Sequence, residues 1–184
     1  MKKIILPIIL ICLIFGTNNY EELNDIAIIT KIGITKKKDN YTVILQEVNP
    51  KKSDDGLDKK YKYYFSKCKK IELCFNKSNE EIPKSLYFNH LENLVINTDT
   101  KKFIYKLNIN ILNDIDNFNV VYTKNNVSKV IKYNNINSII DKKLVFRDIK
   151  KAKLENKSIT IPVVKISDKK LILYKYYKLG DKDE

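Results

Sequence analysis

Few residues in this sequence are of the types that carry out catalysis, and their spacing does not bring them together. His90 is the only histidine, so a serine or cysteine nucleophile would have it alone as an imidazole base, and no neighbouring residue proposes that pairing. It has no cysteine or second histidine close by, which argues against a metal site. The sequence contains neither a glycine-rich phosphate loop nor a nucleophile elbow. We therefore expect no enzyme activity, no catalytic residue, no metal and no cofactor.

Cys68 and Cys74 are the second group of residues whose side chains could react. They have five residues between them, which is not the spacing of a metal site. An oxidising environment outside the cell would permit a disulfide. The more ordinary explanation is two separate thiols that face a hydrophobic core, and this is the state we expect.

The chain is strongly basic, with a formal net charge of +13 in 184 residues. Such a charge favours polyanionic partners: nucleic acid, anionic wall polymers or an anionic membrane surface. However, the lysines are spread along the whole chain, as in proteins from AT-rich genomes, and no basic stripe with interleaved aromatic residues is present. We therefore expect no nucleic-acid partner. Hydrophobic residues make up 43% of the chain, which predicts a folded domain and excludes a disordered polyelectrolyte.

The N-terminus predicts export. Lys2 and Lys3 form a short positive region before an unbroken apolar run at residues 4–15. This run is shorter than the roughly 20 residues that a transmembrane helix needs, but it suits the core of a secretory signal. Residues 1–16 are thus predicted to be a signal peptide or an N-terminal membrane anchor. The alternative, a hydrophobic strand of a cytoplasmic protein, is disfavoured by the paired lysines.

The predicted processing site lacks its usual acceptor residue. Residues 14–17 have the shape of a lipoprotein processing box, but Thr17 occupies the position of the lipid-bearing cysteine. A hydroxyl cannot form the thioether that holds a diacylglycerol, so we expect no lipidation. Cys12 lies inside the apolar run and follows Ile11, which makes it a poor substitute. Ile14 is a poor residue for an ordinary peptidase site, so an uncleaved anchor stays open.

The stretch that follows predicts a β-hairpin. Residues 26–34 are almost wholly apolar, as in a strand that is buried on both faces. Residues 36–40 form a charged turn. Residues 41–48 alternate, so that one set of side chains points to one side and the other set to the opposite side. The first set is Val43, Leu45 and Glu47, and the second is Thr42, Ile44 and Gln46.

The remaining periodicities alternate between strand and helix, which predicts an α+β fold, a mixed β-sheet flanked by helices. Strands are expected at residues 61–66, 86–96, 118–123, 158–167 and 170–178, and helices at residues 69–78, 100–113, 127–140 and 144–154. His90 falls inside the expected strand 86–96. We place the main domain at residues 17–155 and a closing β-hairpin at residues 156–184.

Four stretches of the sequence, in order, resemble the Ger(x)C family of spore germination proteins, the C subunits of nutrient germinant receptors. The first is residues 22–50, where Lys31 and Thr35 replace commoner residues. The second, IPKSLYFNHL at residues 82–91, is similar to the family's Pro-x-x-Leu-Tyr-Phe-Gly-His-Leu segment. Residues 116–131 are a looser match, and residues 161–178 are similar to the segment that leads towards the family's C-terminal domain. The matching positions in the first stretch are Glu22, Asp25, Gly33, Ile34, Asn49 and Pro50.

The resemblance implies the N-terminal domain of an exported, non-enzymatic subunit on the outer face of the spore inner (cytoplasmic) membrane. It also implies partners: the membrane-embedded receptor subunits and the membrane surface. Family members continue into a large C-terminal domain, so we expect a truncated product or a trimmed, degenerate relative. The expected contact residues are Glu22, Asn24 and Asp25, and the expected fold-motif residues are Gly33, Asn49, Pro50, Tyr87 and His90. In that role His90 would hydrogen-bond a neighbouring loop.

Two other functions compete with this interpretation. One is an exported basic module that binds an anionic cell-wall polymer or a membrane surface through its dispersed lysines. The other is a hydrolase whose site is not visible in the sequence.

Overall fold

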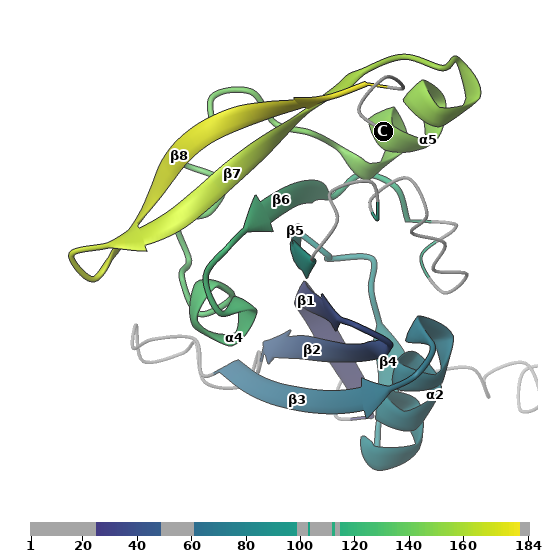
Figure 1. Cartoon of the computed structure of the whole chain (residues 1–184). Coiled ribbons are helices and arrows are strands. Elements are labelled where there is room, and N and C mark those ends of the chain that lie inside the picture. Colours follow the sequence, from purple (N-terminus) through teal and green to yellow (C-terminus); the bar gives the residue numbers. More distant parts are fainter. Residues whose placement is uncertain (1–24, 49–60, 99–102, 104–111, 113–114, 181–184) are drawn as a thin grey trace, which may run out of the picture.

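A mixed eight-stranded β-sheet organises the computed structural model, which describes residues 25–48, 61–98, 103, 112 and 115–180 (Figure 1). The strands follow the order β3-β2-β1-β5-β6-β7-β8, with β4 also paired to β1. The described part has three helices, and the predicted α+β class is confirmed. The strands are β1 (Ile26–Lys37), β2 (Asn40–Val48), β3 (Tyr61–Cys68), β4 (Ser85–Tyr87), β5 (Asn93–Thr98), β6 (Asn119–Thr123), β7 (Ile159–Ser167) and β8 (Lys170–Leu179), and the helices are α2 (Ile71–Glu81), α4 (Val127–Val130) and α5 (Phe146–Leu154).

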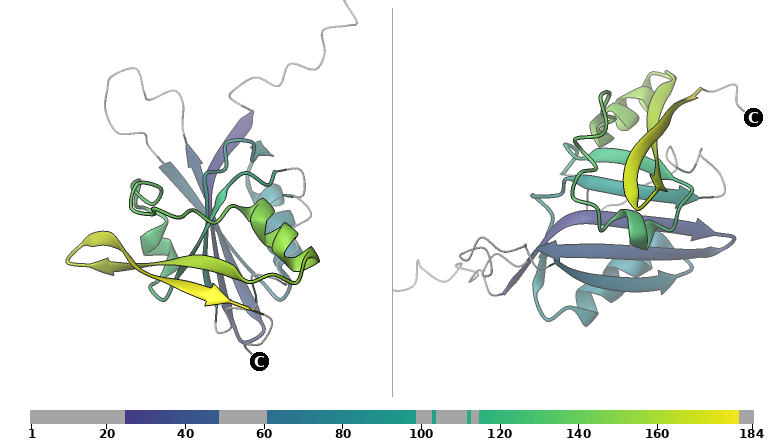
Figure 2. Two further views of the ribbon diagram at one scale, coloured as in Figure 1. Left: turned by 90° about the horizontal axis from the view of Figure 1, so that it is seen from above. Right: turned by 90° about the vertical axis from the view of Figure 1, so that its left-hand side faces the viewer.

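Parallel strands form the centre of the sheet, and antiparallel hairpins form its two sides. β1, β5, β6 and β7 run parallel to one another, whereas β2 and β3 extend the sheet on one side and β8 extends it on the other. The right-handed twist of neighbouring strands accumulates across such a sheet. Figure 2 shows the result: the β7–β8 hairpin crosses the first three strands at a large angle.

Helices cover both faces of the sheet and create two hydrophobic cores. α2 and α5 lie on one face, where Phe75 and Phe146 join the larger core. α4 and the turns that follow it cover the opposite face, where Val130 and Ile136 join the smaller core. Because both faces of the central strands are covered, these strands carry continuous apolar runs, as parallel strands do.

The predicted hairpin at residues 26–48 is confirmed, and so is its division into two faces. Val43 and Leu45 belong to the core under α2, whereas Ile44 belongs to the core under α4. Gly33 also faces α4. A Cβ atom at Gly33 would collide with Cγ1 of Val127, the first residue of that helix. Glycine is therefore required here by the close approach of helix and strand.

The single strand predicted at residues 86–96 is wrong, because this segment forms two strands with a turn between them. β4 pairs with the first residues of β1, and β5 pairs with its second half. β1 has an irregular register between Ile29 and Lys31, and the carbonyl of Thr30 accepts a 2.8 Å hydrogen bond from the backbone N–H of Glu92. Phe88 is buried and fixes the turn to the core. β4 and β5 both pair with β1, at successive stretches of that strand, and local periodicity does not reveal such an arrangement.

Most other predicted elements are confirmed, with shifted ends. The first helix begins later and ends later than predicted, at Ile71–Glu81, and the closing pair of strands forms as an antiparallel hairpin that joins the sheet through β6. Of the helices predicted at residues 127–140, only α4 forms, and turns follow it. The helix predicted at 100–113 lies outside the described residues, apart from Phe103 and Leu112, which are both buried in the larger core. No described helix has the length and apolar character that crossing a membrane requires.

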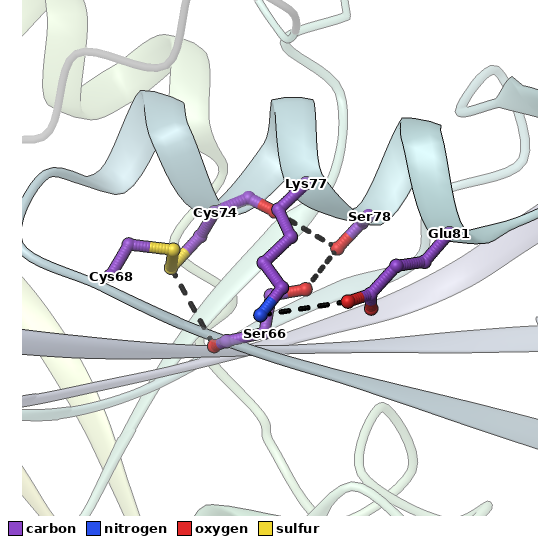
Figure 3. A network of polar contacts seen from close by, with 6 residues as sticks. All are labelled: Ser66, Cys68, Cys74, Lys77, Ser78 and Glu81. Atoms are coloured by element: carbon purple, nitrogen blue, oxygen red, sulfur yellow. Dashed lines mark hydrogen bonds and ion pairs between the residues drawn. A yellow bond between two sulfur atoms is a disulfide. The ribbon is translucent and has the colours of Figure 1, made fainter.

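The two thiols expected to be separate instead form a disulfide, which joins the end of β3 to the first turn of α2 (Figure 3). The packing of α2 on β3 brings the Cα atoms of Cys68 and Cys74 to 5.4 Å, within the range that a disulfide bridges. One turn further along, the buried hydroxyls of Ser66 and Ser78 lie 2.7 Å apart. Ser78 Oγ donates to the Cys74 carbonyl, so the proton between the two hydroxyls comes from Ser66.

Reduction of the Cys68–Cys74 disulfide is expected to lower the free energy of unfolding by about 2 kcal/mol, because it releases the constraint on the unfolded chain. Urea unfolding with and without reductant measures the change. A Cys68→Ser/Cys74→Ser variant should show the lower stability in both conditions, and Cys12→Ser should behave like the wild type. Equal unfolding midpoints for the oxidised and reduced wild-type protein would contradict the expectation.

Candidate interaction site

Three of the residues singled out in the sequence, Asp25, Tyr87 and His90, lie at one end of the sheet, where β1 begins, β2 ends and β3 begins. The backbone carbonyl of Asp25 accepts a 2.8 Å hydrogen bond from Ser85 N–H, so β4 starts beside the first residues of β1. Asp25 itself is exposed. The turn that follows β4 therefore lies next to the point where the chain enters the sheet.

This turn presents an exposed aromatic pair, Tyr87 and His90. Their ring centroids are 5.8 Å apart, and Asn89 Nδ2 donates a 3.0 Å hydrogen bond to the Tyr87 hydroxyl. The neighbouring Phe88 and Leu91 are buried and hold the turn in place. His90 is thus a surface residue. Among the described residues it makes no hydrogen bond, so the bond expected to a neighbouring loop is not found there.

A cavity of about 520 Å³ opens beside His90. Its lining combines apolar residues at the strand ends, neutral polar residues, and residues of positive and of negative charge. Its volume falls in the range of ligand pockets. It is lined by Ile28, Thr30, Lys31, Val48, Tyr61, His90, Glu92 and Asn134.

Lys31 is the unusual member of this lining, because only 2% of its surface is exposed. Its Nζ donates hydrogen bonds to the carbonyls of Tyr133 at 2.9 Å and Ile131 at 3.4 Å, and to Asn134 Oδ1 at 3.3 Å. Burial lowers the pKa of the Lys31 ammonium, and the negative charge of Glu92 partly opposes this shift. With three donors directed to three acceptors, Lys31 attaches the loop after α4 to the middle of β1.

Polar side chains continue from Lys31 across the sheet on the same face. Gln46 on β2 accepts from Thr30 Oγ1 and donates to the Tyr63 hydroxyl at 3.0 Å. On the other side, Asn93 pairs with Lys31 in register and is buried, and its side-chain amide has no hydrogen-bond partner among the described residues. Polar groups thus run beneath the loop at one end of an otherwise apolar core.

The opposite face of the same strand ends contains a buried ion pair. Glu47 is 2% exposed; its carboxylate accepts from Lys84 Nζ at 2.7 Å and from the Tyr64 hydroxyl at 2.6 Å. Burial, followed by the hydrogen bond to Glu47, raises the pKa of Tyr64 to about 12. These bonds fix the connection between α2 and β4, and so help to position the exposed turn.

Sequence reasoning found only part of this site. Asp25, Tyr87 and His90 are brought to the same end of the sheet, whereas Gly33 lies further along β1, under α4. Thr17, Glu22, Asn24, Asn49 and Pro50 lie outside the described residues. Lys31, Tyr61 and Glu92 were missed as site residues. The available signal was the single lysine in the apolar run 26–34, since a charge there must either reach solvent or find buried partners.

The groups at this end of the sheet are aromatic, polar and charged side chains. The described residues contain no group of three or more histidine, cysteine or carboxylate side chains placed to hold a metal ion. What the end of the sheet offers is an exposed aromatic pair on a rigid turn, next to a cavity with charged walls. The fold and this surface define an α+β domain with an exposed aromatic pair beside a cavity at one end of its sheet.

The comparisons with known proteins identify the family of this domain. The family model described as spore germination protein N-terminal domain matches residues 19–168, which is most of the chain. The chain therefore belongs to this family of spore germination proteins, and the Ger(x)C resemblance seen in the sequence is confirmed. No curated protein and no solved structure matches the chain.

Proposed function

We propose that this protein is a non-enzymatic subunit of a spore nutrient germinant receptor, exposed on the outer face of the spore inner membrane. The observation that carries the proposal is the family match over residues 19–168. The match includes Glu22, Asn24 and Asp25, which the sequence analysis selected as partner contacts.

The placement of the exposed turn supports a role in contacting membrane-embedded partner subunits. The apolar N-terminal run ends at residue 15, and the first strand of the sheet begins at Ile26. A fully extended chain of this length spans at most about 40 Å. A protein held at the membrane by its N-terminus would therefore keep Asp25, Tyr87 and His90 within reach of neighbouring membrane subunits. Exposed aromatic residues on a rigid support are typical anchors of protein interfaces.

The test combines Tyr87→Ala and His90→Ala in the native gene. We expect nutrient-triggered germination to slow by about tenfold, with less of the chain copurifying with the membrane subunits, because interface anchors of this type contribute strongly to binding. Leu154→Ala is the matched control: Leu154 is 85% exposed on α5, away from the site. Normal germination of the Tyr87/His90 variant would remove this surface from the proposal. Normal germination after deletion of the gene would overturn the receptor role itself.

A second candidate function is the binding of an anionic wall polymer or membrane surface. The observation that favours it is a cavity of about 700 Å³ at the opposite end of β1, lined by Lys37, Lys38, Lys67 and Lys69 without a carboxylate. Salt-sensitive retention on cell wall, together with normal germination of the deletion strain, would favour this function over the receptor role.

A further inference from the structure

We propose that a cavity between β6, β7 and β8 binds the carboxylate or phosphate group of a small organic anion with an apolar body. This cavity has a volume of about 360 Å³, which lies within the range of small-molecule sites. The site is separate from the exposed turn at the start of β1, and the proposal does not depend on the receptor role. The cavity is lined by Tyr122, Lys124, Asn125, Val163, Val164, Lys165, Ile166, Tyr174, Lys175 and Tyr177.

The floor of this cavity is apolar and rigid. Val163 and Val164 are buried, and Tyr122 is only 7% exposed. These residues lie where β6 and β7 pair, a ladder held further by Thr123 Oγ1, which donates a 2.9 Å hydrogen bond to the Val164 carbonyl. A floor of this kind receives the apolar part of a ligand, whose transfer from water is favourable.

A β-bulge shapes the rim of the cavity. Val163 pairs with Lys175 and Val164 pairs with Leu173, so Tyr174 is the extra residue on β8. Bulges redirect side chains and are frequent beside functional sites. Tyr174 is 53% exposed, and two lysines approach its ring: Lys165 Nζ lies 4.5 Å and Lys175 Nζ lies 5.6 Å from the ring centroid.

The charge of the lining points to an anion. Lys124, Lys165 and Lys175 contribute three positive charges, and the lining contains no aspartate or glutamate. None of the three lysines forms an ion pair with another described residue. Lys165 Nζ and Lys175 Nζ both lie near the Tyr174 ring, and an anion bound beside this ring would be attracted by both ammonium groups.

Asn125 adds a neutral donor to the same cavity. Its Oδ1 accepts a 2.9 Å hydrogen bond from the backbone N–H of Ile166, which fixes the orientation of the amide. Its backbone carbonyl accepts a 2.8 Å hydrogen bond from Asn97 Nδ2, so the loop is held from both sides. Among the described residues Asn125 Nδ2 has no acceptor. A carboxylate or phosphate oxygen is the type of group that would satisfy it.

The cavity differs in these respects from the other cavities described above. The one beside His90 includes Glu92, and its buried lysine already has three acceptors. The one lined by Lys37, Lys38, Lys67 and Lys69 lacks a buried apolar floor. Of these three cavities, only the one at β6–β8 combines a buried apolar floor with lysines and no carboxylate in its lining.

The test measures binding of benzoate, hexanoate and inorganic phosphate to the full chain in mild detergent by titration calorimetry. Benzamide is the uncharged control ligand. We expect saturable binding of at least one anion, weakened by high salt and about tenfold or more by Lys165→Gln/Lys175→Gln, because charge-assisted hydrogen bonds would be lost. Lys151→Gln/Lys153→Gln lowers the net charge by the same amount at two exposed positions of α5 that do not line this cavity, and should leave the affinity unchanged.

Each outcome decides the proposal. Carboxylate binding that depends on Lys165 and Lys175 supports a carboxylate site, and phosphate binding with the same dependence supports a phosphate site. The absence of saturable binding by every anion, equal binding of benzamide and benzoate, or equal losses in the two double variants would overturn it. Thermal unfolding of both variants checks that they are folded.

Discussion

Gly33→Ala is expected to destabilise the domain by about 2 kcal/mol or more, although alanine otherwise suits a strand better than glycine. The reason is the collision between the new Cβ and Cγ1 of Val127. Val127 is β-branched, so its side chain has little rotamer freedom in a helix. α4 cannot easily move away, because Val127, Val130 and Ile131 are buried in the core between the helix and the sheet.

Urea unfolding measures this effect, and two further variants make it specific. Gly180→Ala is the matched control, because a Cβ there would meet only Ser158 Cβ at an ordinary distance of 3.7 Å. Val127→Ala removes the colliding methyl group, so the Gly33→Ala/Val127→Ala variant should lose less stability than the sum of the single changes. A Gly33→Ala protein as stable as Gly180→Ala would show that glycine is not required at this contact.

Lys31→Met is expected to lower the free energy of unfolding by about 2 kcal/mol, because the Tyr133 carbonyl and the Asn134 side chain lose this donor, while the Ile131 carbonyl keeps its bond from Gln46 Nε2. Methionine keeps most of the apolar volume of the lysine stem, so the change removes mainly the hydrogen bonds. Burial of the ammonium group costs free energy in the wild-type protein and lowers the pKa of Lys31, and Lys31→Met removes this cost. We expect the three hydrogen bonds to outweigh it.

The control for this change is Lys62→Met, since Lys62 is exposed on β3. A local measurement separates the effect on the loop from a general loss of stability: amide hydrogen exchange at residues 131–138 should accelerate in Lys31→Met more than in the rest of the domain. Unchanged or increased stability of Lys31→Met would mean that desolvation of the ammonium outweighs its three bonds.

The sequence alone was sufficient where local pattern and burial agree. The alternation of residues 41–48 determined which side chains of β2 face each core, because successive strand residues point to opposite sides. The apolar run before it predicted a strand buried on both faces, and β1 is buried on both faces at residues 31–34, whereas Ile26, Ile28 and Thr30 are half-buried. The resemblance in residues 82–91 identified the segment that contains Tyr87 and His90 and led to the family that the comparisons confirm.

Only the tertiary structure decided where those segments meet. β4 and β5 separate because both pair with β1 around the irregularity near Thr30, a contact between residues far apart in the chain. Cys68 and Cys74 are joined because α2 packs back on β3. The number of residues between the two cysteines does not specify this packing. The partners of Lys31 come from a loop about a hundred residues later in the chain. Local periodicity reports which face of an element is buried, whereas register, loop docking and cavities depend on which distant elements are placed against it.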